Sequence, residues 1–292
     1  MEIRTLQYFL AVVREGTILA ASRSLHVAQP SLSKQMKELE DELGVPLFIR
    51  GNRRITLTEE GRVLKKRAEE MVRLMQVTEE EISQTKSHLS GSVRIGAGES
   101  YSFHYLSRAA SDIVKYHPDI RFHIISGDTQ DLMDELDNGL IDFAVIFSEV
   151  DHTIYESITL PTEDCFGLLM PKDCELAKKD RIRFSDLKSY PIIISRAAEP
   201  YFSGSSELSS LNIAATYNLL YNASLLVEDG LGYAICFDRI INTTGNSSLC
   251  MRPIVPEISN SGHLIWKKYE TFSPAVQLFI DRVHMMIENT AE

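Results

Sequence analysis

The chain has 292 residues, of which 44% are hydrophobic, and it carries a formal net charge of −11. That length suits two or three domains of ordinary size, each with a real core. No apolar run approaches a membrane span and the first residues lack a signal-peptide cleavage pattern, so the sequence predicts a soluble, cytoplasmic protein with no membrane partner.

The acidic charge is concentrated in one part of the chain. Residues 1–90 hold 14 Lys and Arg against 13 Asp and Glu, whereas residues 91–292 hold 16 against 28. A near-neutral first part beside an acidic remainder is typical of a DNA-binding module joined to an unrelated sensing module. Affinity for DNA would then come from local basic clusters and from the pairing of two modules.

The first 44 residues predict three helices. Apolar residues at i, i+3, i+4 and i+7 predict a first helix with one buried face: Leu6, Phe9, Leu10 and Val13. The stretch from Gly16 to Gly44 predicts two further helices joined by a tight turn. Four residues share one face of the second of these and predict its buried side: Leu32, Met36, Leu39 and Leu43.

The opposite face of that third helix is polar in its N-terminal turns, which we call the front of the helix. Gln29 is expected as the N-cap, and Pro30 fits the first turn, where its missing N–H costs nothing. Short hydroxyls, an amide and ammonium groups can reach phosphates and base edges in a major groove. An amphipathic helix with a solvated charged face is the alternative. The candidate DNA-binding residues are Gln29, Pro30, Ser31, Ser33, Lys34 and Lys37.

A wing and a long helix are predicted next. Residues Leu47–Arg50 and Arg54–Leu57 predict short strands joined by a turn at Gly51-Asn52. The basic cluster of this wing predicts minor-groove or phosphate contact: Arg50, Arg53 and Arg54. From Thr58 a helix is expected, and its heptad seam predicts a homodimer through residues 64–89. A homotetramer is expected as the larger assembly. The seam consists of Leu64, Ala68, Met71, Met75, Thr78, Ile82, Thr85 and Leu89.

The pattern AAxxxLxVxQPxLSxQxxxLExxLGxxLFxR runs from Ala20 to Arg50. It resembles the amino-terminal signature of the LysR-type transcriptional regulators, and the likeness extends over essentially the whole chain. The resemblance implies a winged helix-turn-helix domain (1–58), a linker dimerisation helix with a hinge (59–90) and an effector-binding domain (91–292). It also implies a double-stranded DNA operator and a small-molecule effector as partners, with RNA polymerase as a candidate partner.

From Val93 onward strands and helices alternate, which predicts an α/β fold with a parallel sheet. Strands are expected at Val93–Ala97, Arg121–Ser126, Asp142–Phe147, Cys165–Met170, Pro191–Ser195, Ile213–Tyr217, Tyr233–Cys236 and His263–Lys268. Helices are expected at Phe103–Lys115, Gln130–Asn138, Leu219–Glu228 and Pro274–Ile287. The resemblance implies two lobes like those of a periplasmic solute-binding protein, lobe I at 91–161 and 267–292 and lobe II at 162–266.

Ligands of open α/β sheets bind beyond the carboxyl ends of the strands. Free N–H groups at the helix starts there suit a carboxylate or phosphate, so a small organic anion is the expected effector. The candidate effector-binding residues are Ser100, Tyr101, Thr129, Ser195, Arg196, Tyr201 and Phe202. The alternative is that Ser100 and Thr129 only cap helices. Asp128 satisfies a helix start itself and would repel an anion.

No catalytic motif is present: the sequence lacks GxSxG, HExxH, a Walker loop and a GxGxxG after a strand. We therefore expect no enzyme activity, catalytic residue, metal site or cofactor. The four cysteines form no CxxC pair. Cys165 and Cys174 invite comparison with peroxide-sensing members of the family, with incidental thiols as the default. A solute-binding or transport protein on the same two lobes is the alternative function.

Overall fold

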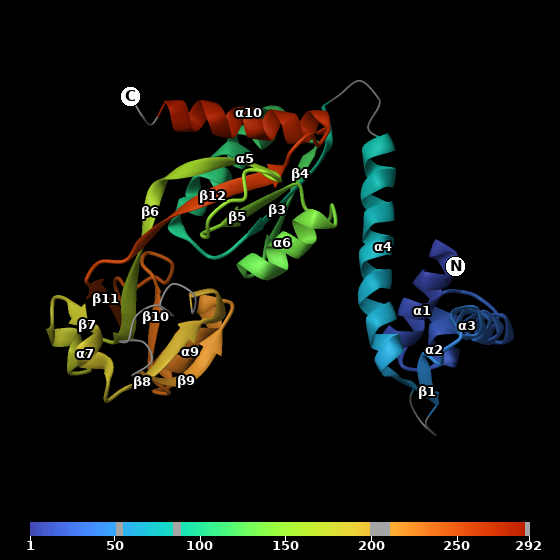
Figure 1. The fold of residues 1–292 in the computed structure, drawn as a ribbon, viewed down its shortest axis with the longest axis horizontal. Coiled ribbons are helices and arrows are strands. Elements are labelled where there is room, and N and C mark those ends of the chain that lie inside the picture. Colours follow the sequence, from blue (N-terminus) through green and yellow to red (C-terminus); the bar gives the residue numbers. More distant parts are fainter. Residues whose placement is uncertain (51–54, 84–88, 199–210, 290–292) are drawn as a thin grey trace. The chain divides into compact units, whose positions relative to one another are not determined.

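The computed structural model describes residues 1–50, 55–83, 89–198 and 211–289. The chain divides into two compact units, Met1–Thr85 and Lys86–Glu292 (Figure 1). None of the helices in these described stretches is both long and apolar enough to cross a membrane.

The first unit is a helical domain with a small hairpin. It contains α1 (Ile3–Glu15), α2 (Ile18–Ser24), α3 (Gln29–Leu43), β1 (Phe48–Arg50), β2 (Ile55–Leu57) and the long helix α4 (Glu59–Ser83). Gly16 (φ 70°) and Gly44 (φ 72°) end α1 and α3 in the left-handed conformation that glycine adopts without a steric cost. The predicted periodicity is confirmed at the centre of the domain, where Leu6, Phe9, Leu32, Met36 and Leu39 are all buried.

Several details of this unit differ from the sequence prediction. Ala28 is the N-cap of α3, so Gln29 is its first helical residue. Leu43 is 40% exposed because α3 ends there and its last turn extends past the core. The hairpin strands begin at Phe48 and Ile55, one residue later than expected. Gly51, Asn52, Arg53 and Arg54 lie outside the described residues, as does the side chain of Arg50.

Several residues of the heptad seam predicted for α4 pack within their own chain and not against a second chain. Leu64, Ala68 and Met71 pack against the core of their own domain, and Ala68 is fully buried there. Leu89 follows α4 and packs against the core of the second unit. The side chains of Ile82 and Thr85 lie outside the description. Half of the expected dimer seam is therefore occupied within one chain.

The second unit begins with the parallel sheet that the βαβαβ pattern predicts. β3 (Gly91–Ala97) pairs in parallel with β4 (Ile120–Ser126) and with β5 (Phe143–Ile146). Helices α5 (His104–Tyr116) and α10 (Pro274–Glu288) cover one face of this sheet, and α6 (Thr129–Asp137) covers the other (Figure 1). β3 begins at Gly91, two residues before the strand start expected at Val93.

Two long antiparallel strands carry the chain between the lobes. β6 (Tyr155–Pro171) runs through the sheets of both lobes, and β12 (Ser259–Lys267) returns beside it (Figure 1). The second lobe contains β7 (Ile182–Arg183), α7 (Phe184–Leu187), β8 (Pro191–Ser195), β9 (Asn212–Tyr217), α9 (Leu220–Glu228), β10 (Tyr233–Phe237) and β11 (Leu249–Val255). The sequence did not predict β7, α7 or β11. It predicted that the chain returns to lobe I at residue 267, whereas β12 already pairs with β5 of lobe I at His263.

Candidate effector site and DNA-binding surface

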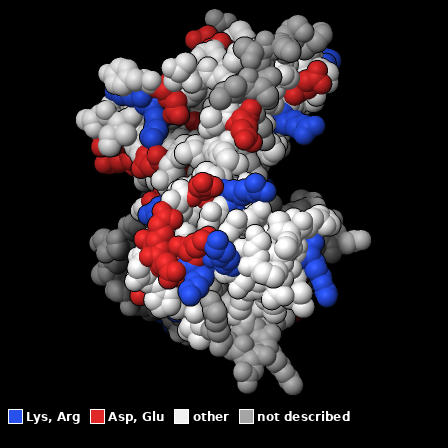
Figure 2. All heavy atoms as spheres, turned by 90° about the vertical axis from the view of Figure 1, so that its right-hand side faces the viewer, with Lys and Arg blue, Asp and Glu red and all other residues white. Residues whose placement is uncertain are grey.

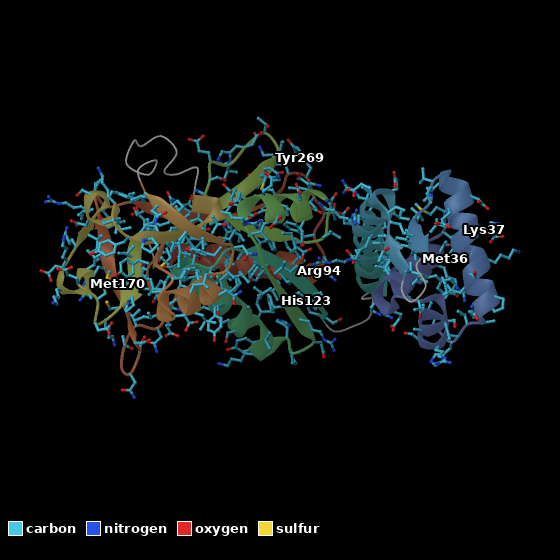
Figure 3. All side chains as sticks on the ribbon, turned by 90° about the horizontal axis from the view of Figure 1, so that it is seen from below. Met36, Lys37, Arg94, His123, Met170 and Tyr269 are labelled. Carbon is cyan, nitrogen blue, oxygen red and sulfur yellow. The ribbon has the colours of Figure 1, made fainter. Side chains whose placement is uncertain are left out.

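The front of α3 presents short polar and basic side chains to solvent. Gln29, Pro30, Ser31 and Lys37 are exposed, while Ser33 is half-buried. Figure 3 shows Met36 on the side of α3 that faces the other helices and Lys37 on the outer side. Because the apolar face is fully used in the core, the polar face is the one available to a partner.

Charge on this unit is mixed in sign. The ammonium of Lys34 lies 3.5 Å from the carboxylate of Glu38, one helical turn further along α3. On the face shown in Figure 2, basic and acidic side chains are interspersed. Attraction to DNA phosphates must therefore be local, as the near-neutral charge of residues 1–90 indicates.

Glu40 fixes the hairpin relative to α3. One of its carboxylate oxygens accepts hydrogen bonds from the backbone N–H groups of Leu47 (2.8 Å) and Phe48 (3.1 Å). Glu40 was not among the residues for which the sequence predicted a role. Since a charged acceptor with two N–H donors makes strong bonds, Glu40 anchors the start of the hairpin to the C-terminal half of α3.

A small cavity of about 80 Å³ lies between the two lobes of the second unit. Thr129, at the start of α6, and Ser195, at the end of β8, both line it, as expected for strand and helix ends. The aromatic rings of Phe147, Phe166 and Phe237 form much of the remaining wall. Their centroids lie 4.9 Å (Phe147 to Phe237) and 4.5 Å (Phe166 to Phe237) apart.

Ser100 and Tyr101 are not part of that cavity wall. They line an adjoining, more open groove together with Arg239 and His104. The hydroxyl of Ser100 lies 3.0 Å from that of Ser102. The structure thus separates Ser100 from Thr129, which the strand pattern placed in one site. Tyr201 and Phe202 lie outside the described residues.

Arg196 reaches across the cleft to an acidic partner. Its guanidinium donates to Asp128 at 2.7 Å and lies 3.6 Å from Asp131. Asp128 also accepts the N–H of Asp131 and so caps α6. An ion pair between solvent-accessible groups contributes little stability, but it does link the two lobes.

Two further carboxylates in the cleft were not singled out by the sequence analysis. Glu99 accepts a hydrogen bond from the N–H of Leu220, at the start of α9 in the second lobe. Asp164 on β6 is fully buried and accepts from the N–H groups of Tyr101 (2.7 Å) and Ser102 (3.4 Å). Burial raises the pKa of Asp164, and these hydrogen bonds partly oppose that shift.

Arg239 was also missed. It has a positive φ of 61°, and its guanidinium carbon lies 4.3 Å from the ring centre of Tyr101. Its Nε donates to Asp238 at 3.0 Å and its Nη2 donates to the carbonyl of Glu163 at 2.9 Å. A positive φ at a non-glycine residue can mark a functional site, and this backbone conformation is visible only in the structure.

The cysteines are all free thiols. Burial raises the pKa of Cys165, Cys236 and Cys250, so their reactive thiolate forms are disfavoured. Cys236 lines the cavity between the lobes. These surroundings suit packed thiols rather than thiols activated for reaction with peroxide.

Two family descriptions match nearly the whole chain. "Bacterial regulatory helix-turn-helix protein, lysR family" matches residues 3–62, and "LysR substrate binding domain" matches residues 86–286. The fold and these matches define a DNA-binding transcriptional regulator with a separate effector-binding domain. The chain belongs to the LysR family of transcriptional regulators. The matches give no support to the alternative of a solute-binding transport protein.

Individual relatives agree with this assignment. The HTH-type transcriptional regulator BsdA of Bacillus subtilis (strain 168) is 32% identical over 197 residues, which is 67% of each chain. The regulator YfeR of Shigella flexneri, described as uncharacterized, is 24% identical over 96% of this chain and 92% of its own. The crystal structure of CbnR, a LysR family regulator, shares the fold with a TM-score of 0.76 and 19% identity, covering 98% of this chain and 99% of that one.

Proposed function

We propose that the front of α3 and the adjoining hairpin bind an operator, and that a small molecule in the cavity between the lobes changes this binding. The observation that carries the proposal is the division of α3 into a buried apolar face and an exposed polar front. The proposed DNA contacts are Gln29, Pro30, Ser31, Ser33, Lys34, Lys37, Arg50, Arg53 and Arg54. The proposed effector contacts in the cavity are Thr129 and Ser195.

The domain limits are part of this proposal. We assign residues 1–58 to DNA binding, 59–90 to the linker and 91–292 to the effector domain. We also propose that the protein acts in the cytoplasm without a cofactor and is not an enzyme. Relatives that are transcriptional regulators support this. RNA polymerase remains a proposed partner.

The test is a fluorescence-anisotropy titration with a duplex selected from a random-sequence library. Ser33→Ala and Gln29→Ala should relax sequence preference, because each removes a base-edge hydrogen bond that contributes about 1–3 kcal/mol of discrimination. Lys37→Ala should weaken all duplexes alike and reduce the salt dependence by one phosphate contact. Lys188→Ala, exposed in the other unit, is the control. Unchanged affinity and preference in all three α3 variants would contradict the assignment.

We also propose a homodimer through α4. Val63 (61% exposed) and Leu74 (44% exposed) lie eleven residues apart and therefore on the same helical face. This face remains available after Leu64, Ala68 and Met71 have packed on their own domain. Exposed apolar side chains on α9, Tyr221 and Leu225, offer a second self-association face for a tetramer.

A further inference from the structure

The charged side chains in the wall of the cavity have the same sign. Among the described residues that line it, Glu99 and Asp128 carry charge, and none is Lys, Arg or His. Residues 199–210 contain neither Lys, Arg nor His in their sequence. Arg196, which reaches the cleft from the second lobe, is already paired with Asp128 and Asp131. A desolvated carboxylate in this cavity would therefore meet like charges and no unpaired cation.

One N–H group at each helix start beside the cavity is already bound by a carboxylate of the chain. The carboxylate of Asp128 accepts the N–H of Asp131 at the start of α6. The carboxylate of Glu99 accepts the N–H of Leu220 at the start of α9. Helix N-termini attract anions because of their free N–H groups and the helix dipole. An anionic ligand at either helix start would lie beside a carboxylate that already binds there and would be repelled by it.

The rest of the wall is apolar. The rings of Phe147 and Phe166 each pack in a tilted arrangement against that of Phe237. Leu132, Val145 and Leu220 complete much of the surface. Each carboxylate oxygen has more than one lone pair, so Glu99 and Asp128 can accept a further hydrogen bond from a ligand. The cavity thus combines an apolar body with acceptors at its polar end.

We propose, on the basis of the function assigned above, that the cavity takes a small apolar molecule whose polar end donates hydrogen bonds, as an ammonium or hydroxyl group does. Glu99 is the residue that discriminates against carboxylates, because it holds a negative charge at the start of α9. This ligand class differs from the small organic anion expected from the strand-end pattern. That pattern could not show which side chains already occupy the helix starts.

The adjoining groove offers the competing outcome. It carries Arg239 beside Ser100, so it has the cationic group that the cavity lacks. The guanidinium of Arg239 is, however, held by Asp238, by the carbonyl of Glu163 and by the ring of Tyr101. An anion bound there would depend on Arg239 and not on Glu99.

The experiment is calorimetric titration of the full-length chain with three probes that share one ring: benzylamine, benzyl alcohol and benzoate. We expect benzylamine or benzyl alcohol to bind measurably and benzoate not to bind. In Glu99→Gln, which keeps an acceptor for the Leu220 N–H, benzylamine should bind at least tenfold more weakly and benzoate binding should become measurable. Asp128→Asn keeps the α6 cap and should shift selectivity in the same direction.

Glu288→Gln, exposed on the last turn of α10, is the matched control and should behave as wild type. Benzoate binding to the wild type that is lost in Arg239→Gln would overturn the proposal, as would failure of all three probes to bind. Operator affinity, measured on the same preparation, separates these outcomes from a failure of the DNA-binding function. If the wild-type chain binds none of the probes but still binds the operator, only this inference is contradicted.

Discussion

Replacing Ala68 with aspartate should unfold the DNA-binding unit while the effector unit remains folded. Ala68 is fully buried where α4 packs on the core of the first unit. A carboxylate there would be desolvated without a charged partner, a change that belongs to the most destabilising class, at about 3–5 kcal/mol. Differential scanning calorimetry of the full-length chain should show the transition of residues 1–85 lost or shifted to low temperature, with operator binding abolished.

Leu74→Asp is the matched control on the same helix. Leu74 is 44% exposed and lies on the face of α4 that the domain core does not use. The substitution should preserve the transition of the first unit but shift the protein toward monomers in analytical ultracentrifugation. If Leu74→Asp also unfolds the first unit, or leaves the assembly unchanged, the proposed division of α4 into a core face and a pairing face is wrong.

The elements of the fold could largely be predicted from the sequence because their apolar periodicities are strong. The spacing of Leu32, Met36 and Leu39 predicts the buried face of α3, and all three are buried. The alternation of strands and helices after Val93 predicts the parallel sheet. In both cases local pattern and tertiary packing agree, which is why the prediction holds.

The seam on α4 shows the limit of such patterns. A heptad repeat establishes that one face of a helix is apolar, but it does not say what covers that face. Leu64 and Met71 are covered by their own domain, and Leu89 by the second unit. The long strand β6 was predicted only from Cys165 to Met170, because Pro161 and Asp164, which precede that stretch, are residues that disfavour a strand.

The candidate site could be located from the sequence but not assembled from it. Thr129 and Ser195 follow strand ends and do line one cavity. The contacts that Glu99 and Arg196 make with the opposite lobe depend on how the two lobes close, which no local pattern encodes. Asp164 was missed for the same reason, since its donors lie more than 60 residues earlier in the chain.

Asp164 is expected to be a buried structural acceptor with an unusual pH dependence. Asp164→Leu removes the acceptor of the Tyr101 and Ser102 N–H groups, so it should lower the free energy of unfolding by about 1–3 kcal/mol. Asp164→Asn keeps one acceptor oxygen and should cost less. Urea unfolding of the full-length chain, followed through the transition of the effector unit, measures both effects.

The pH dependence gives a sharper test because its sign is fixed by the direction of the pKa shift. Burial raises the pKa of Asp164 above its ordinary value of 3.8, so the contribution of this group to stability is fully present below that value and is lost as the pH rises through the folded-state pKa. The deficit of Asp164→Asn relative to wild type should therefore be larger at pH 3, below the ordinary pKa of an aspartate, than at pH 8. Asp186→Asn should show the opposite trend, because the hydrogen bond from Lys179 lowers the pKa of Asp186. Parallel trends in the two variants would mean that burial does not control the protonation of Asp164.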